Sequence, residues 1–246
     1  DGKVDIAFVD STSYIVSILP GRGSRLFGGR VDYRTGARPA FVTMIDVSGD
    51  GWLDLVVPNE DDNTISVLLG RGDGTFAPRV NYTVGIEPCQ QSVGDLNGDG
   101  LLDIVVVNEG SNSLSILLGT GAGAFGTETQ FATGDQPRTV EIGDLSGDGI
   151  PDLAVPNFSA HTVSVLLGAG AGRFAGHVDY PTGQLPWGLA LGDFNEEGHL
   201  DAATANAATS DVSVFIGDGL GALGPKTDIP TGFIPRTVRS KDMNHD

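Results

Sequence analysis

The sequence predicts an all-β fold, a β-propeller of four-stranded antiparallel blades, on three observations. First, a unit of 49 residues recurs without insertion or deletion, with equivalent aspartates at Asp46, Asp95, Asp144, Asp193 and Asp242. This period lies within the roughly 40–50 residues that propeller blades occupy. Second, each unit contains short β-branched runs bounded by Gly and Asn/Asp clusters, the pattern of strands. Third, no segment keeps a 3.6-residue apolar period, so almost no helix is expected.

Each unit is expected to contribute four strands in a fixed order. The first follows a proline, as in residues 137–142, and an acidic, glycine-rich loop comes after it. The second is an apolar run such as 103–107, and the third resembles 114–118. The fourth begins near a Gly-x-Phe element and runs through an aromatic residue such as Phe131 to a Thr-Gly turn. Four antiparallel strands repeated around an axis form a propeller.

The two ends of the chain determine how the ring is predicted to close. Residues 1–36 supply only the second to fourth strands of a unit, whereas residues 233–246 supply only the turn, the proline and the first strand. Pairing these segments would complete the first blade and remove exposed strand edges, which favour aggregation. We therefore interpret residues 1–246 as a single propeller domain of five blades. A five-repeat piece of a seven-bladed ring would have the same pattern, so that alternative stays open.

The composition narrows the class of protein further. The formal net charge is −18, from 14 Lys and Arg against 32 Asp and Glu, whereas a nucleic-acid-binding domain is usually basic. The single cysteine, Cys89, excludes an intramolecular disulfide. No apolar run approaches the ~20 residues of a membrane span. We expect no nucleic-acid partner and no membrane insertion.

Five acidic loops follow the pattern Asp-x-[Asn/Ser]-x-[Asp/Glu]-Gly-x-x-Asp and contain sixteen of the 32 acids. Ca²⁺ binds 6–8 oxygens, and oxygens at positions 1, 3, 5 and 9 with the main-chain carbonyl of position 7 would converge on one ion. The glycine at position 6 permits the sharp turn. The predicted ligands of the four complete loops are Asp46, Ser48, Asp50, Trp52, Asp54, Asp95, Asn97, Asp99, Leu101, Asp103, Asp144, Ser146, Asp148, Ile150, Asp152, Asp193, Asn195, Glu197, His199 and Asp201. The fifth loop is divided between the chain ends and consists of Asp242, Asn244, Asp246, Asp1 and Asp5.

Four to five Ca²⁺ ions per chain are therefore the predicted cofactor. The alternative is that these loops are ordinary Asx turns of hairpins, but five copies in register favour a cation that offsets carboxylate repulsion. Mg²⁺ is the less favoured ion, because it demands tighter octahedral geometry than these loops are expected to provide. An EF-hand is excluded because position 12 is an apolar residue such as Val106. The loops at Asp95 and Asp144 are expected to bind best, the loop with Glu196 and Glu197 less well, and the divided loop least.

At these residues the chain resembles the FG-GAP/VCBS-type calcium-binding repeat family, whose blades also form the head of integrin α subunits. The resemblance spans the whole chain and is carried by residues 95–103, 162–168 and 72–76. It implies an extracellular propeller, secreted or at the cell surface, that calcium stabilises and that acts in adhesion or in recognising a protein or carbohydrate ligand. Some members of the family are attached to enzymes.

No active site is expected, so the protein is predicted not to be an enzyme. The four histidines, His161, His177, His199 and His245, stand at different repeat positions. Cys89 has no histidine at a spacing that would activate it, so a buried structural thiol is expected.

A ligand face is predicted from the position after the repeated proline, which differs in every unit. Because Trp and Arg are frequent interface anchors, we hypothesise that Arg138, Trp187 and Arg236 form part of it, with simple packing as the alternative. Three functions remain open: a calcium-stabilised recognition module, a lectin with sugars between blades on Trp52 or Trp187, and the recognition part of a larger secreted enzyme.

Overall fold

The computed structural model describes residues 2–24 and 26–241, and within them every regular element is a β-strand. Five sheets follow one another along the chain, one for each repeat. The first sheet contains β1 (Ile6–Asp10), β2 (Ile15–Leu19) and β5 (Val31–Arg34). The second contains β6 (Thr43–Ile45), β7 (Asp54–Asn59), β8 (Thr64–Leu68) and β9 (Val80–Thr83). The third contains β10 (Pro88–Gly94), β11 (Asp103–Asn108), β12 (Ser113–Leu117) and β15 (Thr129–Ala132).

The fourth and fifth sheets repeat this order. They contain β16 (Glu141–Gly143), β17 (Asp152–Asn157), β18 (Thr162–Leu166) and β21 (Val178–Pro181), followed by β22 (Pro186–Gly192), β23 (Asp201–Asn206), β24 (Asp211–Phe215) and β25 (Thr227–Pro230). Small hairpins leave the third strand of three units: β3 (Gly21–Gly23) with β4 (Leu26–Phe27), β13 (Gly119–Gly121) with β14 (Ala124–Phe125), and β19 (Gly168–Gly170) with β20 (Arg173–Phe174). All strand pairs are antiparallel between neighbours, as predicted, and four of the five sheets have the predicted four strands.

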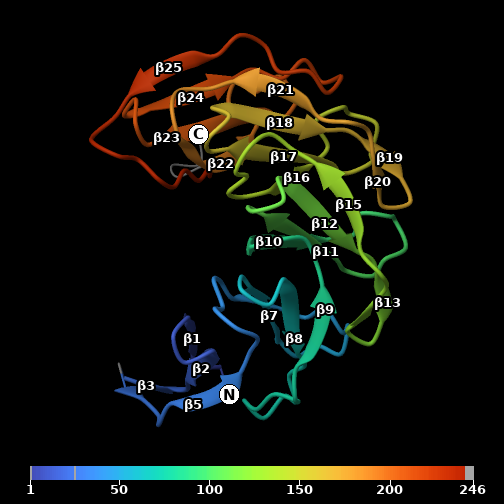
Figure 1. Ribbon diagram of the computed structural model, residues 1–246, viewed down its shortest axis with the longest axis vertical. Coiled ribbons are helices and arrows are strands. Elements are labelled where there is room, and N and C mark those ends of the chain that lie inside the picture. The colour runs from blue at the N-terminus through green and yellow to red at the C-terminus, as the bar shows by residue number, and fades with distance from the viewer. Residues whose placement is uncertain (1, 25, 242–246) are drawn as a thin grey trace.

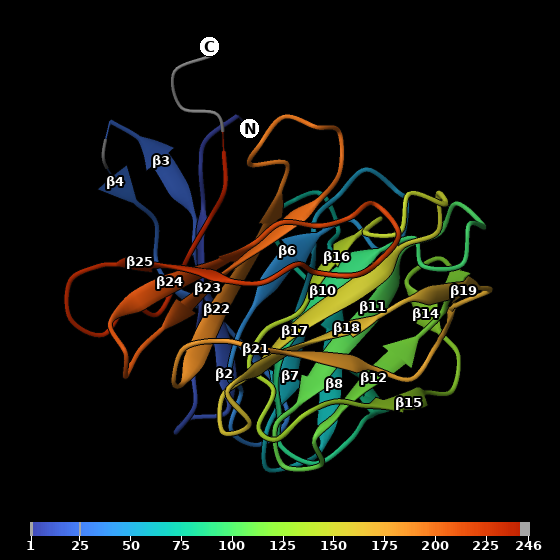
Figure 2. The same ribbon diagram turned by 90° about the horizontal axis from the view of Figure 1, so that it is seen from above.

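The sheets are arranged radially around an opening (Figure 1). Their first strands, β10, β16 and β22, border this opening, and their last strands, β9, β15 and β21, lie at the outer rim. Hydrophobic clusters fill the space between successive sheets. One cluster joins Leu114 and Ile116 of the third sheet to Leu153 and Val155 of the fourth, and Figure 2 shows these two sheets stacked.

Burial on both faces explains the apolar second strands. All six residues of β7, β11, β17 and β23 are buried, because neighbouring residues along each strand face different neighbouring sheets. In β11, Val105 and Val107 belong to the cluster shared with the fourth sheet, whereas Ile104 and Val106 belong to the cluster shared with the second. A strand that is buried on both sides reads as a continuous apolar run rather than an alternating one.

Aromatic pairs join the rims of the first four units, each to the next. Tyr33 meets Phe76 edge to face with ring centroids 5.3 Å apart. Tyr82 with Phe125, and Phe131 with Phe174, repeat this arrangement at 5.4 Å. Each pair joins an outer strand to the Gly-x-Phe element of the following unit, so this element serves contacts between repeats.

The predicted closure of the ring is not present among the described residues. The first sheet has three strands and ends at β1, and no strand forms in residues 233–241. That segment lies instead against β22, where the Ser240 hydroxyl donates to the carbonyl of Leu191 at 2.6 Å. In Figure 1 the first and fifth sheets lie on opposite sides of a gap in the arc. Pairing of residues 233–246 with the first sheet therefore remains a prediction, and residues 242–246 lie outside the described part.

Candidate metal-binding loops

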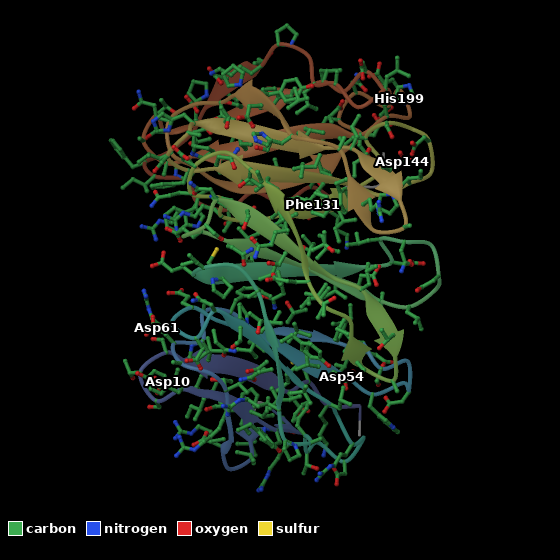
Figure 3. All side chains as sticks on the ribbon, turned by 45° about the vertical axis from the view of Figure 1, so that its right-hand side comes forward. Asp10, Asp54, Asp61, Phe131, Asp144 and His199 are labelled. Atoms are coloured by element: carbon green, nitrogen blue, oxygen red, sulfur yellow. The ribbon has the colours of Figure 1, made fainter. Side chains whose placement is uncertain are left out.

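The acidic loops connect the first and second strands of their units and lie together on one face of the molecule. In Figure 3, Asp54, Asp144 and His199, from three different loops, point to the same side. Asp10 and Asp61, which belong to the turns after second strands, lie on the opposite side. The repeat thus brings equivalent acidic loops to one face, with their four complete copies at 46–54, 95–103, 144–152 and 193–201.

The aspartate at position 1 organises each loop. Asp46 accepts hydrogen bonds through Oδ1 from the amides of Gly49 (2.7 Å) and Asp50 (3.2 Å), and through Oδ2 from Gly51 (2.7 Å). Asp95 does the same with Gly98, Asp99 and Gly100. Asp144 and Asp193 likewise accept from the amides at positions 5 and 6. The loop backbone therefore wraps around its first carboxylate.

The side chains at positions 1, 3 and 5 lie next to one another. The Ser48 hydroxyl donates to Asp46 Oδ1 at 3.1 Å. Asn97 Nδ2 donates to Asp99 Oδ2 at 3.0 Å, and the Asp99 amide donates to Asn97 Oδ1 at 2.8 Å. These side chains are therefore neighbours within the loop, and their role as ligands of one ion stays a prediction.

The aspartate at position 9 is a fully buried hydrogen-bond centre, which sequence reasoning did not predict. Asp152 accepts through Oδ2 from the amides of Leu145 and Ser146, each at 2.9 Å, and through Oδ1 from Gly168 at 2.7 Å. Its side chain thus fastens the loop to the start of the outer hairpin. The hydrogen bond from the Gly168 amide to Asp152 has an equivalent in each of the other four units. The donor and acceptor pairs are Gly21 and Asp5, Gly70 and Asp54, Gly119 and Asp103, and Gly217 and Asp201.

The glycine partner in this bond allows the close approach. A Cβ built on Gly168 would lie 2.4 Å from the carbonyl oxygen of Pro151, and its four equivalents would meet the matching carbonyl at 2.1–2.5 Å. The sequence did contain a sign of this hydrogen bond, because the glycine recurs with the same 49-residue spacing as the aspartate that accepts from it.

The loop carboxylates differ in the direction in which their surroundings shift the pKa. Hydrogen bonds from backbone amides, above all that of Gly51, lower the pKa of Asp46. For Asp95, burial acts in the opposite direction, but the amides of Gly100 and Gly98 still lower the pKa. Burial raises the pKa of both Asp54 and Asp103, against the amide hydrogen bonds that they accept. Burying these two carboxylates in charged form therefore costs free energy.

The donor set of each loop suits a hard cation. Carboxylate, hydroxyl or amide oxygens with one main-chain carbonyl are the ligands that Ca²⁺ takes, and no nitrogen or sulfur donor is required. Within residues 2–24 and 26–241, no three Asp, Glu, His or Cys side chains lie close enough together to form a metal site on their own. The loops would therefore hold Ca²⁺ through the mixed oxygen set, and carboxylates alone would not be sufficient. Of the divided loop, Asp1, Asp242, Asn244 and Asp246 lie outside the described residues.

The loop of the fifth unit keeps the backbone conformation of the others at position 4 but has a glutamate there in place of glycine. Gly49, Gly98 and Gly147 have φ of 75°, 79° and 71°, and Glu196 adopts the same left-handed conformation at 61°. An L-residue with a side chain pays about 1–2 kcal/mol for this conformation relative to glycine. The predicted weakness of this loop thus has a backbone cause in addition to the longer carboxylate at Glu197.

Replacing Glu196 by Gly is expected to raise the free energy of unfolding by about 1 kcal/mol, because the left-handed strain is removed. The midpoint of thermal unfolding should rise by about 2–4 °C in a chain of this size. The matched control is Gly98→Ala, which should lower stability by a similar amount. A Glu196→Gly variant that melts at or below the wild-type temperature would contradict this account.

The predicted ligand-face residues lie together on the face opposite the loops. The guanidinium carbon of Arg138 lies 4.7 Å from the Trp187 ring centroid, and that of Arg236 lies 4.8 Å from it. Two residues that the sequence did not single out join them: Phe158 meets Trp187 edge to face at 5.3 Å, and Glu109 forms an ion pair with Arg138. Both follow a buried asparagine that ends a second strand. Because these side chains contact one another, and because two guanidinium groups stack on the Trp187 ring, the structure favours the packing alternative. A role of these residues in ligand binding stays a prediction.

A Ser-His-Asp cluster in the fourth unit is also structural in form. Ser164 is fully buried, and its hydroxyl donates to Asp179 Oδ1 at 2.6 Å. His177 Nδ1 lies 2.9 Å from the same carboxylate oxygen and 3.5 Å from Ser164 Oγ, so the short contact of the hydroxyl is with the aspartate. A nucleophilic serine would need the histidine as its proton acceptor. Equivalent serines contact outer-strand Asp or Asn residues in other units, for example Ser17 with Asp32. The cluster is therefore one copy of a repeated strand-to-strand bridge.

Cys89 is held among main-chain carbonyls, with its Sγ 3.7 Å from the carbonyl oxygens of Val107 and Arg138. Burial, assisted by the Glu109 charge and opposed by Arg138, raises the pKa of the thiol to about 12. Because the thiolate is the reactive form, alkylation by iodoacetamide at about pH 8 should be at least ~100-fold slower in the folded than in the denatured protein. Mass spectrometry of timed reactions measures this ratio, and comparable rates in the two states would contradict the buried-thiol prediction.

Comparisons with known proteins agree with this architecture. The model of the FG-GAP-like repeat matches residues 1–57, 46–92 and 95–155. Among solved structures, an Agrocybe aegerita lectin that recognises non-reducing terminal N-acetylglucosamine superposes with a TM-score of 0.60 at 21% identity, covering 95% of this chain and 67% of the lectin. A Bacteroides fragilis protein classed as a 6-phosphogluconolactonase gives a TM-score of 0.73 at 14% identity, with 95% and 69% covered. Virginiamycin B lyase from Staphylococcus aureus gives 0.64 at 14% identity, with 96% and 71% covered.

These likenesses establish the fold, and at such identities they do not transfer an activity. No curated protein sequence matches the chain. Among the residues that the structure describes, none forms a helix long and apolar enough to cross a membrane. Because the repeat model matches well over half of the sequence, the chain belongs to the FG-GAP-like repeat family.

Proposed function

We propose that the protein is a non-catalytic, calcium-binding propeller that acts outside the cell, secreted or at its surface, as a recognition or adhesion module. The observation that carries this proposal is the recurrence of one acidic loop in consecutive units, with position 1 gathering the loop amides and position 9 buried in the sheet. Ca²⁺ bound by the folded state alone would stabilise it by mass action. Extracellular modules bind Ca²⁺ at about 10⁻⁴–10⁻³ M, which suits a rigidifying ion outside the cell.

Titration calorimetry of chelator-treated protein tests the calcium part of this proposal. Four or five Ca²⁺ should bind per chain, with Mg²⁺ binding more weakly. Asp99→Asn, at position 5 of the third unit, should remove or weaken one site. Asp61→Asn, on the opposite face (Figure 3), is the control and should leave every site intact. Absence of calcium binding by the folded wild-type protein would overturn the proposal.

A lectin is the second candidate, and the Agrocybe aegerita lectin of similar fold favours it. Trp52 is 52% exposed beside its loop, whereas Trp187 is covered by guanidinium groups. Binding in a glycan array that is lost in Trp52→Ala and kept in Trp187→Ala would support this candidate. The third candidate is a recognition part of a larger secreted enzyme, which attachment to a catalytic domain would support.

Closure of the five units into one ring through the chain ends is proposed as well. In the second to fifth sheets, Met44, Val93, Ile142 and Leu191 face Leu55, Ile104, Leu153 and Ala202. The same register would place Ser240 opposite Ile6. In a Cys89→Ser background, Ile6→Cys with Ser240→Cys should form an intramolecular disulfide on mild oxidation. Absence of this cross-link in a folded, oxidised monomer would favour the open arc.

A further inference from the structure

An open groove lies at the outer rim between the first and second units. Its volume is about 720 Å³, and it is lined by β5, by the end of β8, and by the segment that leads from β8 to β9. Ligand pockets for small molecules commonly have volumes of about 300–1,000 Å³. None of the residues that line the groove belongs to a first strand or to the Arg138 cluster. Its strand β5 lies near the bottom of Figure 1.

Three arginines, Arg34, Arg71 and Arg79, line this groove, and no acidic residue does. This is unusual in a chain with only 14 basic residues and a net charge of −18. Over residues 2–24 and 26–241, neither Arg34 nor Arg71 forms an ion pair, and Arg79 Nε donates to Asn81 Oδ1 at 3.1 Å. Asp73, on the same hairpin, accepts hydrogen bonds from the amide (2.9 Å) and hydroxyl (2.6 Å) of Thr75. The three exposed guanidinium groups therefore line the groove without an ion pair to a carboxylate of the described residues, and the Arg79 side chain is held by Asn81.

The other units show that the fold itself does not require these arginines. At the position of Arg34 the next units carry Thr83, Ala132 and Pro181. At the position of Arg71 they carry Thr120, Ala169 and Asp218, and at the position of Arg79 they carry Glu128, His177 and Lys226. The first unit does carry Arg22 and Arg30 at the positions of Arg71 and Arg79, but no arginine of a preceding outer strand joins them, since Pro230 stands at the position of Arg34 in the fifth unit. The combination of three arginines is thus confined to one place, while structural positions such as the aromatic pair are kept as aromatic or apolar residues.

The other residues that line the groove indicate which class of anion it could bind. Tyr33 and Phe76 contribute an edge-to-face aromatic pair with centroids 5.3 Å apart, both half-buried beside the arginines. Asn81 Oδ1 already accepts from Ser66 and Arg79, so its Nδ2 is the group left to donate. An apolar aromatic wall, an amide donor and several guanidinium forks suit a sugar ring that carries an acidic substituent. Arginine recognises planar carboxylate and tetrahedral sulfate oxygens in bidentate fashion.

We propose that this rim groove binds an anionic saccharide, a sugar that carries a carboxylate or a sulfate, through Arg34, Arg71 and Arg79. The inference rests on the proposed recognition role and names its ligand class, but it does not depend on calcium. The two sources of negative charge, uronic acid and sulfate ester, share the same recognition chemistry and are separated by the choice of probe.

The test is titration calorimetry of the full chain with four probes: a digalacturonic acid, a heparin-derived sulfated disaccharide, the neutral disaccharide cellobiose, and inorganic sulfate. We expect at least one acidic disaccharide to bind at one site, and the two acidic probes separate carboxylate from sulfate recognition. Binding should weaken as salt is raised, since screening acts on the exposed guanidinium groups. Equal binding of cellobiose, or of inorganic sulfate with the same affinity as the disaccharide, would overturn the proposal, as would the absence of binding by both acidic sugars.

Variants then locate the site. Arg34→Ala with Arg71→Ala and Arg79→Ala should weaken binding by at least about tenfold, as expected for losing charge-assisted hydrogen bonds. The control changes the same net charge at exposed positions elsewhere, with Arg22→Ala, Arg173→Ala and Lys241→Ala, and should bind as the wild type does. Equal losses in the two variants would overturn the proposal. Calcium stoichiometry measured on the same samples separates failure of this site from failure of the calcium-binding module.

Discussion

Removal of Ca²⁺ is expected to destabilise the protein more than any single substitution on its surface. At about 2 mM free Ca²⁺ and a dissociation constant of ~10⁻⁴ M, each occupied loop adds about 1.8 kcal/mol to the free energy of unfolding. Four independent loops would together add about 7 kcal/mol. With about 2–4 °C for each kcal/mol in a chain of this size, the melting temperature should fall by about 14–28 °C on chelation.

The physical reason is the charge that the loops concentrate. Asp54 and Asp103 are fully buried, and burial raises their pKa values, so at neutral pH the apoprotein keeps carboxylates in an environment that disfavours their charge. Asp50 and Asp99 stand beside them at position 5 and add like charge. A divalent cation bound in each loop would replace the repulsion between these carboxylates with their attraction to the ion.

Differential scanning calorimetry with excess chelator, with Ca²⁺ and with Mg²⁺ measures the effect. The control for ionic strength is NaCl at matched concentration, which screens exposed charges but does not bind the loops specifically. Identical melting temperatures in chelator and in Ca²⁺ would mean that the loops are Asx turns and that the central proposal is wrong.

The repeat itself was the most informative feature of the sequence. The constant spacing of Asp, Gly and Pro predicted the strand order and the antiparallel sheets, because a strand assigned in one repeat could be checked against the same positions in the other repeats. That the loops share one face was found only in the structure, as Asp54 and Asp144 show in Figure 3. Closure of the ring could not be predicted in the same way. It depends on the angle between successive sheets, which the side chains of all the clusters between the sheets determine together. The pattern of a single repeat does not indicate this angle.

Side-chain environments explain what the sequence could not give at the site. Asp152 and Asp148 are both acids of one loop, yet the first is fully buried and accepts three amides, while the second is exposed. Spacing alone made them equivalent ligands. The rim groove was missed for another reason, since Arg34 belongs to one unit and Arg71 and Arg79 to the next, so no local motif unites them.

Replacing Asp152 by Ala is expected to be the most destabilising change within a loop. It removes the acceptor of three amide hydrogen bonds, from Leu145, Ser146 and Gly168. A buried amide left without a partner costs about 1–3 kcal/mol, so the loss of three acceptor contacts should lower the free energy of unfolding by at least about 3 kcal/mol. Urea-induced unfolding followed by circular dichroism measures this change.

Comparison with Asp148→Ala, in the same loop, separates the structural part of the site from the metal-binding part. Asp148 is exposed and accepts one hydrogen bond, from the Ile150 amide. Its loss should lower stability in Ca²⁺ by about 2 kcal/mol, the contribution of one bound ion, and by little in chelator. Asp152→Ala should lower stability in both conditions, because its hydrogen bonds exist without the ion. If the two variants behaved alike in chelator, position 9 would be only a ligand, and the hydrogen bonds that join the loop to Gly168 would contribute nothing to the stability of the blade.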